Sequence, residues 1–340
     1  MNKSIIKSLL LVISVLIVGV TLAITVLELL RSAEADRPKA GFDSILASKD
    51  ICAIGYDGTT IFAAGAGGIF RINPVTLESQ ELGDFSYVRC LYASEAGLWA
   101  GTDTGLYHIV GDQIIRYTTR DGLPDDRVLA IEALDNNQLW LGTWGGAVEI
   151  ALAEAGEIRV ITAYTSQNGL LTDNVNVINQ DSGGGLWFGS YVAPRGGISV
   201  LLANGEWQHF TTENGLLHGN ITAILKRRDD TVVVGAGLHR YGGATVFTQT
   251  DGKWQPLNSL TKADGLAGEK VRSLYEDKKG RLWIGSEYDG LVIIDGQTIT
   301  KLTSETGLVH NEVKVITQDQ AGNYWIGTLS GLTRIDGGVV

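Results

Sequence analysis

The chain has 340 residues, and 44% of them are hydrophobic, which is enough for a large core in one or two domains. It carries 44 glycines but only 5 prolines, and this excess of glycine favours many turns over long helices. A formal net charge of −11 without a basic stripe argues against nucleic acid as a partner. The two cysteines, Cys52 and Cys90, are too few for a disulfide framework or a zinc site.

Residues 1–30 differ in character from the rest of the chain. Lys3 and Lys7 precede Ser8–Leu27, a run without a charged residue that would be about 30 Å long as a helix. This pattern predicts a short cytoplasmic stub followed by one transmembrane helix, with everything after it on the outer side. The alternative is a cleaved signal peptide, because Ala33-Glu34-Ala35 resembles a cleavage site. Both interpretations export residues 31–340.

Residues 31–49 are predicted to form a linker that contains a closing strand. The chain stops soon after the turn at Asp336, which leaves the last repeat without an outer strand. In several other repeats the outer strand lies eleven residues before the next inner strand. The same count back from Ile51 places a closing strand at Lys39–Ile45, where it would join the two ends of the chain.

Residues 50–340 contain a sevenfold repeat. The mark of each copy is a small glycine that ends a short apolar run, at spacings of 36, 41, 47, 46, 50 and 42 residues. The seven glycines are Gly65, Gly101, Gly142, Gly189, Gly235, Gly285 and Gly327. The copy around Gly285 reads as four strands joined by tight turns, at Val271–Glu276, Arg281–Ser286, Gly290–Ile294 and Thr298–Leu302. This pattern predicts an all-β, seven-bladed β-propeller of four-stranded antiparallel blades, preceded by the transmembrane helix.

Two further features recur in the repeat. The first strand of each copy carries an aliphatic pair three residues apart, such as Val128 and Ile131, which predicts one side chain on each face of an inner strand. Five copies carry a tryptophan two residues before the glycine, which predicts a wedge between neighbouring blades. The first copy has Ala63 at that position and the fifth has Val233.

A third recurrent feature is the turn T-x-x-[D/N/T]-G-L between successive repeats. It occurs at Thr118–Leu123, Thr165–Leu170, Thr211–Leu216, Thr261–Leu266 and Thr303–Leu308. The polar side chains of this turn could be ligands, but their recurrence in five copies favours a structural role, with the leucine folded back into the core.

Residues 122–143 (G-L-P-D-D-R-V-L-A-I-E-A-L-D-N-N-Q-L-W-L-G-T) and their counterparts resemble the two-component regulator propeller repeat. The resemblance covers about residues 50–338. It implies the extracytoplasmic sensor region of a hybrid two-component system, in which seven-bladed propellers respond to ligands such as glycan fragments. The sequence contains no kinase, receiver or immunoglobulin-like module after the propeller, so the downstream signalling part is expected to be missing or supplied by another chain.

Catalytic patterns are few. The glycines at 65–68 lack the rest of a dinucleotide fingerprint, and no hydrolase, zinc-protease or calcium-loop motif occurs. His218 and His310 occupy matching places after the blade-to-blade turn, where they could form a metal or proton-transfer pair or simply cap the turn. The related streptogramin lyases usually carry a glutamate near the position where this chain has Gly-Thr or Gly-Ser. No cofactor and no metal site is predicted.

The loops between second and third strands differ most between repeats. They are predicted to lie around the mouth of the central channel, on the same face as the blade-to-blade turns. We predict a ligand site there, formed by Trp144, Tyr191, Arg195, His239, Arg240, Tyr241 and Tyr288. Aromatic residues with arginine are typical of binding sites. The alternative is that these loops vary without consequence.

Cys52 and Cys90 follow the first aliphatic residue of their inner strands by one and two residues. They should therefore point to opposite faces, which allows a disulfide between adjacent blades in an oxidising compartment. The same parity allows both to point away as small buried residues.

Three functions remain open at this point. The first is a membrane-anchored, extracytoplasmic propeller that binds a small-molecule or glycan ligand, or an envelope protein, without catalysis. The second is a hydrolase or lyase of the streptogramin-lyase type, and the third is a scaffold for an envelope complex.

Overall fold

The computed structural model describes residues 39–340 except residues 84, 135–137, 154–155 and 193–194. The predicted transmembrane run Ser8–Leu27 lies outside these residues. Among the residues that are described, no helix is both long and apolar enough to span a bilayer. The membrane anchor therefore stays a prediction.

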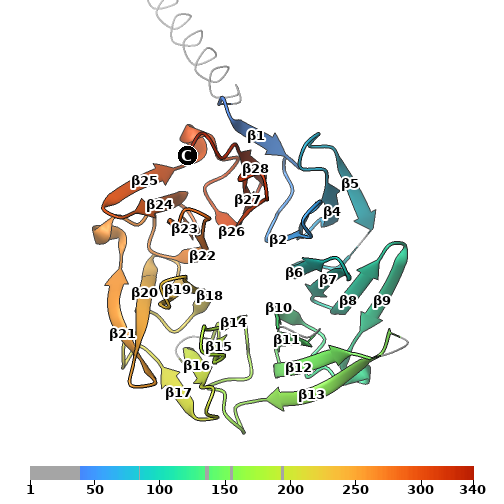
Figure 1. Cartoon of the computed structure of the whole chain (residues 1–340), viewed down its shortest axis with the longest axis vertical. Helices are drawn as coiled ribbons and strands as arrows, with labels where there is room; N and C mark the ends of the chain where they lie inside the picture. The colour runs from blue at the N-terminus through green and yellow to red at the C-terminus, as the bar shows by residue number, and fades with distance from the viewer. Residues whose placement is uncertain (1–38, 84, 135–137, 154–155, 193–194) are drawn as a thin grey trace, which may run out of the picture. The chain divides into compact units, whose positions relative to one another are not determined.

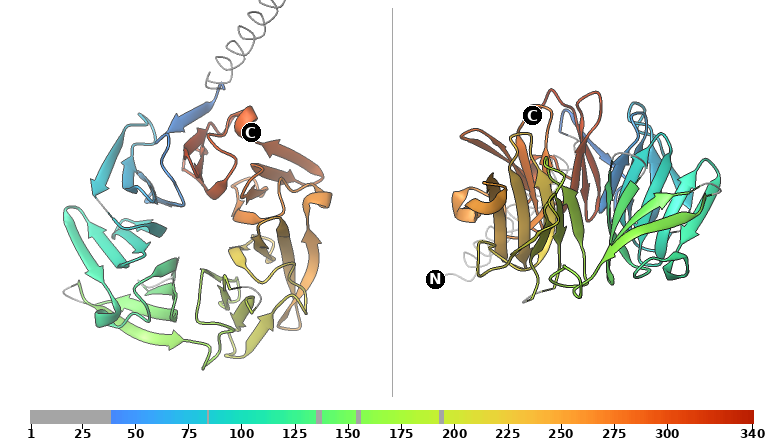
Figure 2. Two further views of the ribbon diagram at one scale, coloured as in Figure 1. Left: turned by 180° about the vertical axis from the view of Figure 1, so that it is seen from behind. Right: turned by 60° about the horizontal axis from the view of Figure 1, so that its bottom comes forward.

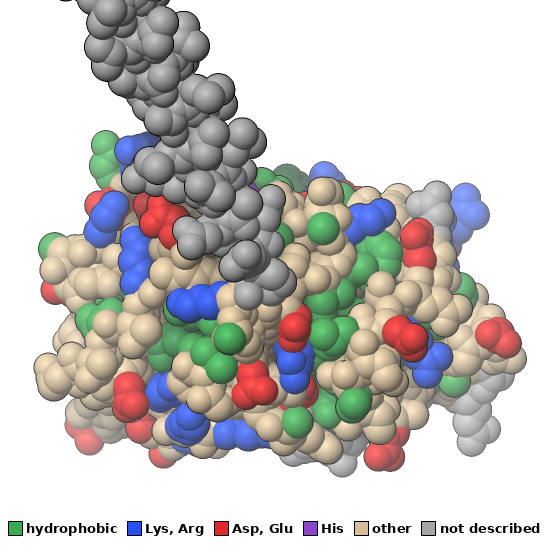
Figure 3. Space-filling view, turned by 90° about the horizontal axis from the view of Figure 1, so that it is seen from above, with side chains coloured by type: hydrophobic (Ala, Val, Ile, Leu, Met, Phe, Trp, Pro, Cys, Tyr) green, Lys and Arg blue, Asp and Glu red, His purple; other side chains and the backbone are tan. Residues whose placement is uncertain are grey.

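Seven four-stranded antiparallel sheets surround a central axis, so the predicted all-β, seven-bladed propeller is confirmed (Figure 1). The compact unit spans Phe42–Val340 and so begins before residue 50. Each blade runs from an inner strand beside the axis to an outer strand at the rim (Figures 1 and 2). On the part of the rim displayed in Figure 3, acidic and basic side chains are interspersed among hydrophobic ones.

The first four blades consist of β2–β5 (Ala53–Tyr56, Ile61–Gly65, Gly68–Ile72, Ser79–Gly83), β6–β9 (Val88–Ser94, Gly97–Thr102, Gly105–Val110, Gln113–Tyr117), β10–β13 (Val128–Ala133, Gln138–Thr143, Gly146–Leu152, Ile158–Tyr164) and β14–β17 (Val177–Gln180, Leu186–Gly189, Ile198–Leu201, Trp207–Phe210). The other three consist of β18–β21 (Ile221–Lys226, Val232–Leu238, Tyr241–Thr250, Lys253–Leu260), β22–β25 (Val271–Glu276, Leu282–Ser286, Leu291–Asp295, Thr298–Leu302) and β26–β28 with β1 (Val313–Gln318, Tyr324–Thr328, Gly331–Ile335, Phe42–Ile45). Three short 3-10 helices, Thr119–Asp121, Lys262–Asp264 and Ser304–Thr306, lie in blade-to-blade turns. In blade 6 the predicted strands match those observed to within one residue at each end.

The closing strand is β1, and it lies within the predicted stretch Lys39–Ile45. It pairs antiparallel with β28, so the seventh blade combines strands from both ends of the chain. Its two apolar ends pack in different directions. Phe42 joins the cluster that contains Trp283 of blade 6, whereas Ile45 joins the cluster that contains Ile61 of blade 1. One strand therefore joins blade 7 to both of its neighbours.

The recurrent glycine marks a close contact between blades. A Cβ atom at Gly101 would lie 2.8 Å from Val128 Cγ1 of the next blade, and one at Gly327 would lie 2.8 Å from Ile51 Cγ2. The predicted register of the first blade was wrong by one residue, because Ala53 pairs with Ala64 there. Ala64, and not Gly65, is thus the counterpart of Gly101, which pairs with Cys90. By the same register Phe62, and not Ala63, stands at the tryptophan position.

The aliphatic pairs lie on one face of the inner strand, which corrects the prediction of opposite faces. Val128 and Ile131 both pack in the cluster that contains Trp99 of the preceding blade. The cause is a shift of register between Val128 and Ala130, a β-bulge that adds one residue to the inner strand. Blades 2, 5, 6 and 7 show the same shift at the equivalent place. An extra residue reverses the alternation of side chains beyond it.

The tryptophans are wedges between blades, as predicted. Trp187 is completely buried against Phe247 and Ile224 of blade 5, and Trp325 against Ile61 of blade 1. In blades 4, 6 and 7 the indole Nε1 donates to a buried aspartate six residues earlier in the chain. This aspartate closes the turn between the first and second strands.

The blade-to-blade turns have the structural role that their recurrence favoured. In the turn after blade 2, the Thr118 N–H donates to Asp121 Oδ2, and Gly122 has a φ of 102°. Leu123 donates back to the Thr118 carbonyl and is buried. Only glycine adopts such a φ without strain.

Glu132 makes stability depend on pH. It lies in β10 and accepts a hydrogen bond from the Gln180 N–H of blade 4, at 3.0 Å. Burial raises the pKa of Glu132 to about 7, although the Gln180 N–H and Lys226 act in the opposite direction. A raised carboxyl pKa means that the folded state binds its proton more tightly, so stability falls as the pH rises from 4.5 to 7.

We expect Glu132→Gln to raise the free energy of unfolding by about 1–3 kcal/mol at pH 8 and to change it little at pH 4. The amide keeps an acceptor for Gln180 and has no charge to desolvate. Denaturant unfolding at both pH values tests this, with the exposed Glu305→Gln as a control. An equal effect at both pH values would contradict it.

Candidate ligand site at the channel mouth

A cavity of about 560 Å³ lies at one mouth of the channel, and all seven blades contribute to its wall. Its volume is within the usual range of small-molecule sites, about 300–1,000 Å³. The lining residues are Cys52, Tyr87, Arg89, Asp103, Arg127, Leu129, Trp144, Asn174, Asn176, Tyr191, Thr222, Arg272 and Lys314.

Seven of these residues occupy one equivalent position, directly after the first aliphatic residue of the inner strand. From blade 1 to blade 7 they are Cys52, Arg89, Leu129, Asn176, Thr222, Arg272 and Lys314. We call them the channel ring. In five blades this position is the bulged residue, and a β-bulge re-aims its side chain away from the strand's regular alternation. The surrounding scaffold repeats, but the ring does not, and this is where the blades differ chemically.

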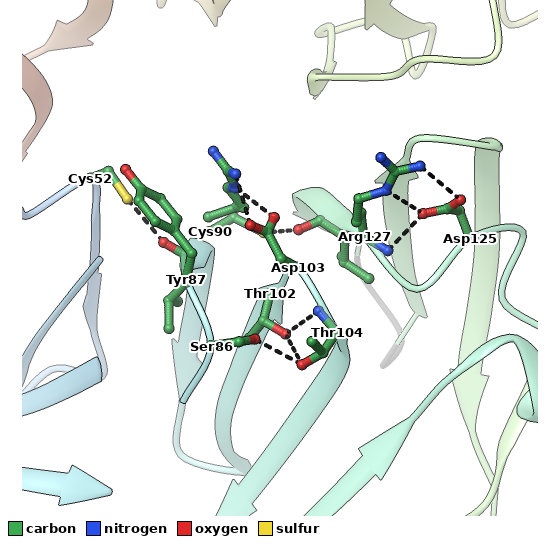
Figure 4. Close-up of polar contacts among 12 residues, drawn as sticks. Cys52, Ser86, Tyr87, Cys90, Thr102, Asp103, Thr104, Asp125 and Arg127 are labelled. Carbon is green, nitrogen blue, oxygen red and sulfur yellow. Dashed lines mark hydrogen bonds and ion pairs between the residues drawn. The ribbon is translucent and has the colours of Figure 1, made fainter. Parts of the chain in front are cut away.

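Cationic side chains of the cavity are held by carboxylates from neighbouring loops. Arg89 binds Asp103 through two hydrogen bonds of 2.8 and 2.9 Å. Arg127 likewise binds Asp125, at 3.0 and 3.3 Å (Figure 4). The hydrogen bonds that Arg89 donates to Asp103 raise the pKa of Arg89 further, so that it stays charged. Both guanidinium groups are thereby fixed in position at the cavity wall.

A longer chain of polar contacts crosses the seam between blades 7 and 1. Lys314 donates to Asp50 at 2.7 Å, and Tyr87 of the second blade donates to the other oxygen of Asp50 at 2.8 Å. Asp50 lies in the connection between β1 and β2. The cavity wall is therefore bonded to the segment that closes the ring.

Besides Tyr87, two aromatic side chains line the cavity, Trp144 and Tyr191. Trp144, which is 49% exposed, lies 4.4 Å from the Arg127 guanidinium, measured to its ring centroid. The Tyr191 hydroxyl accepts a hydrogen bond from Lys270 at 3.0 Å. Both residues were predicted from the sequence, and both line this cavity. They offer apolar faces beside fixed charges, an arrangement suited to a ring-shaped ligand with polar groups.

Three other predicted residues, His239, Arg240 and Tyr288, line a separate cavity of about 210 Å³, which is formed by connections of blades 5 and 6. Lys270 lines this second cavity, forms an ion pair with Glu287 and contacts Tyr191 of the first. The predicted single ring of residues is therefore divided into two sites, with Lys270 between them.

The remaining two predicted residues, Arg195 and Tyr241, line neither of these two cavities. Tyr241 is 74% exposed at the start of the long strand β20, and Arg195 is exposed in the loop before β16. In blade 5 the connection has only two residues, but strands β19 and β20 are longer than their counterparts β7 and β8 of blade 2, and Tyr241 pairs with Leu238 at the end of this longer hairpin.

The cysteines are both free thiols, so of the two alternatives left open by the sequence the structure has no disulfide. Cys52 Sγ donates to the Val88 carbonyl of blade 2, whereas Cys90 Sγ lies 4.0 Å from the Val128 carbonyl of blade 3. They point across different blade seams and cannot meet. Burial, followed by the charge of Asp50, raises the pKa of Cys52 to about 11, so this lining residue is a thiol and a weak nucleophile at neutral pH.

His218 and His310 do not converge. The Nδ1 atom of each accepts the backbone N–H two residues later, from Asn220 and Glu312 respectively. They cap equivalent turns, as the alternative interpretation held. Across the described residues, no group of three His, Cys, Asp or Glu side chains could hold a metal ion.

Sequence reasoning missed the cationic part of the site, namely Arg89, Arg127, Arg272 and Lys314. The signal was nevertheless present. The residue after each first aliphatic changes from cysteine to arginine, leucine, asparagine, threonine, arginine and lysine along the repeats. Other positions of the repeat keep similar side chains from copy to copy, so variation at this one position indicates a binding site.

The sequence model of the family described as "Two component regulator propeller" matches residues 265–288 and 307–330. These two matches cover the first two strands of each of the last two blades. A comparison with curated proteins gave no match.

Two solved structures illustrate what the fold is similar to. The first is the extracellular domain of the hybrid two component system BT3049 from B. thetaiotaomicron, with a TM-score of 0.74 and 20% identity. The alignment covers 89% of this chain and 41% of that one, so the chain spans about two fifths of its length. The second is an inactive virginiamycin B lyase from Staphylococcus aureus with quinupristin, with a TM-score of 0.64, 17% identity and coverage of 87% and 98%.

Proposed function

The chain carries the two component regulator propeller repeat, and from this premise we propose that it is a sensor-type propeller. In this proposal the predicted N-terminal helix holds it at the membrane, with the propeller on the extracytoplasmic side. It binds a small-molecule or glycan ligand in the channel-mouth cavity and does no chemistry on it. A separate protein supplies the output.

One observation carries the proposal. A repeated scaffold converges on a cavity whose seven equivalent ring positions carry six different residue types, with Trp144 and Tyr191 beside them. Structural positions of the repeat, such as the wedge tryptophans, keep similar chemistry from blade to blade. A ring that varies at the shared mouth of all blades is what recognition of one asymmetric ligand would require.

The similarity to the extracellular domain of a two component system supports the sensing role, since it is greater than the similarity to the lyase. The raised pKa of Cys52 removes the one thiol of the cavity wall as a ready nucleophile. A lyase or hydrolase is the second candidate, favoured by the likeness to the virginiamycin B lyase fold.

We expect the full chain to bind at least one member of an array of mono- and oligosaccharides. Trp144→Ala and Tyr191→Ala should each weaken that binding at least tenfold, because each removes an aromatic face of the cavity. Arg195→Ala and Tyr241→Ala should bind like the wild type, since they lie outside it. The reverse pattern would place the site elsewhere.

Mass spectrometry of the bound compound after prolonged incubation separates binding from catalysis. Recovery of the unchanged compound is the expected result. Conversion of the compound to a cleaved or eliminated product would contradict the sensor proposal and favour the lyase or hydrolase.

A further inference from the structure

We propose that the ligand of the channel-mouth cavity is an organic anion, whose carboxylate, sulfate or phosphate group binds Arg272 with Lys314 beside it. This inference rests on the proposed function and adds the chemical class of the ligand and the residue that anchors it. Arg272 of blade 6 and Lys314 of blade 7 are neighbours in the channel ring.

The cavity wall gathers four cationic side chains in an acidic protein, and most of their carboxylate partners (Asp50, Asp125 and Glu312) lie behind the lining residues. The wall contains Arg89, Arg127, Arg272 and Lys314 but one carboxylate, Asp103. The chain as a whole has a net charge of −11, and the rim displayed in Figure 3 mixes both signs. An anion therefore meets a potential at this mouth that differs from that of the protein as a whole.

The four cations are not equally available. Arg89, Arg127 and Lys314 each have a carboxylate oxygen within 3.0 Å. The ion pair that the described residues offer Arg272 is longer, 3.7 Å from its Nη2 to Glu312 Oε1. That carboxylate is also shared with Lys314, at 3.5 Å. A guanidinium presents five N–H donors in a planar fork that matches a carboxylate or sulfate. Arg272 is thus the cation with donors to spare.

A β-bulge directs the Arg272 side chain to the cavity. Register shifts between Val271 and Ser273, and between Val313 and Val315, make Arg272 and Lys314 the bulged residues of their strands. The Arg272 side chain is 27% exposed and that of Lys314 is 7% exposed. An incoming anion can reach the first and be attracted by the second, in a partly enclosed space where charges interact strongly.

Glu312 is the internal competitor of the ligand. It touches both cations, and its side chain is 14% exposed. Together with Asp50 it balances the two positive charges at this seam. An external anion must therefore bind against local repulsion from Glu312. Removal of that charge should tighten binding, whereas removal of the Arg272 fork should weaken it.

The test uses calorimetry on the full chain with matched probes. The anions are glucuronate, galacturonate, glucose 6-sulfate and glucose 6-phosphate, and the neutral partners are glucose and galactose. We expect at least one anion to bind at least tenfold more tightly than its neutral partner. Its affinity should fall as NaCl rises from 50 to 500 mM, because salt shortens the distance over which charges interact, from about 10 Å at 0.1 M to about 3 Å at 1 M. The uronates and the sulfate or phosphate esters distinguish the two sources of charge.

Variants assign the anchor. Arg272→Gln should weaken the bound anion at least tenfold, Arg272→Lys should have an intermediate effect because it keeps the charge without the fork, and Glu312→Gln should tighten binding. Arg159→Gln, an exposed arginine of the outer strand β13, removes the same charge and should change nothing. Unaltered melting temperatures verify that the variants are folded.

Three outcomes would overturn the inference. If a neutral sugar binds as well as its anion, and Trp144→Ala abolishes that binding, the inference fails while the proposed function stands. If an anion binds equally well to Arg272→Gln and the wild type, the anchor is wrong. If none of the four anions binds, the ligand class is wrong, and the sugar array decides the proposed function independently.

Discussion

Deletion of residues 36–46 should lower the melting temperature by about 10 °C or more, because it opens the ring at blade 7. The deletion removes all four residues of β1 and leaves the edge of β28 unpaired. It also removes Phe42, whose ring packs against Gly307, and with it the contact to blade 6. Loss of one buried phenylalanine alone costs about 3–5 kcal/mol, and a larger domain loses about 2–4 °C per kcal/mol.

A peptide provides the control for this deletion. A synthetic peptide of residues 39–48, added in excess to the deleted chain, should pair with β28 and restore part of the melting temperature by strand addition. A peptide of the same composition in scrambled order should not. An unchanged melting temperature in the deleted chain would show that the β1 pairing contributes little to the stability of the ring.

Asp277→Ala should destabilise the propeller by about 3–5 kcal/mol, the typical cost of breaking a buried charge pair. Asp277 is completely buried in the turn before β23. Its Oδ2 atom accepts hydrogen bonds from Trp283 Nε1 at 3.0 Å, Arg281 Nε at 2.7 Å and the Tyr324 hydroxyl at 3.0 Å. Alanine would leave two buried donors and a buried guanidinium without this acceptor, at the seam of blades 6 and 7.

The effect should depend on pH. Burial by itself would raise the pKa of Asp277, but the hydrogen bonds from Trp283, Arg281 and Tyr324 outweigh it and hold the pKa below its ordinary value of 3.8. The folded-state pKa is the lower one, so this carboxylate contributes stability that is fully present above the ordinary pKa. That contribution is lost as the pH falls through the folded value.

Denaturant unfolding of the wild type, Asp277→Ala and Asp277→Asn at pH 6 and pH 3 measures both effects. The advantage of the wild type over Asp277→Asn should shrink at pH 3. Asp112→Ala, at an exposed position in the turn between β8 and β9, should cost less than about 0.5 kcal/mol. A cost of that size for Asp277→Ala would mean that the turn rearranges to supply another acceptor.

The candidate site was predicted in part. Trp144 and Tyr191 lie where the variable loops placed them, because a propeller always gathers its second-to-third-strand loops around one mouth. His239, Arg240 and Tyr288 line a second cavity, and Arg195 and Tyr241 line neither cavity. Loop sequence does not determine where a connection places its side chains, since this also depends on the length and pairing of the flanking strands, as β19 and β20 illustrate in blade 5.

The sequence by itself determined the number of blades, the wedge tryptophans, the blade-to-blade turns and the closing strand. Each of these depends on local spacing and on burial of apolar side chains, which a repeated pattern records directly. Only the tertiary structure decided which way the inner strands point their side chains. The β-bulge after the first aliphatic residue is a matter of pairing between strands, and it reverses the parity that a straight strand would have. This extra residue directs the side chains of Arg272 and Lys314 to the cavity and places Val128 and Ile131 on one face of their strand.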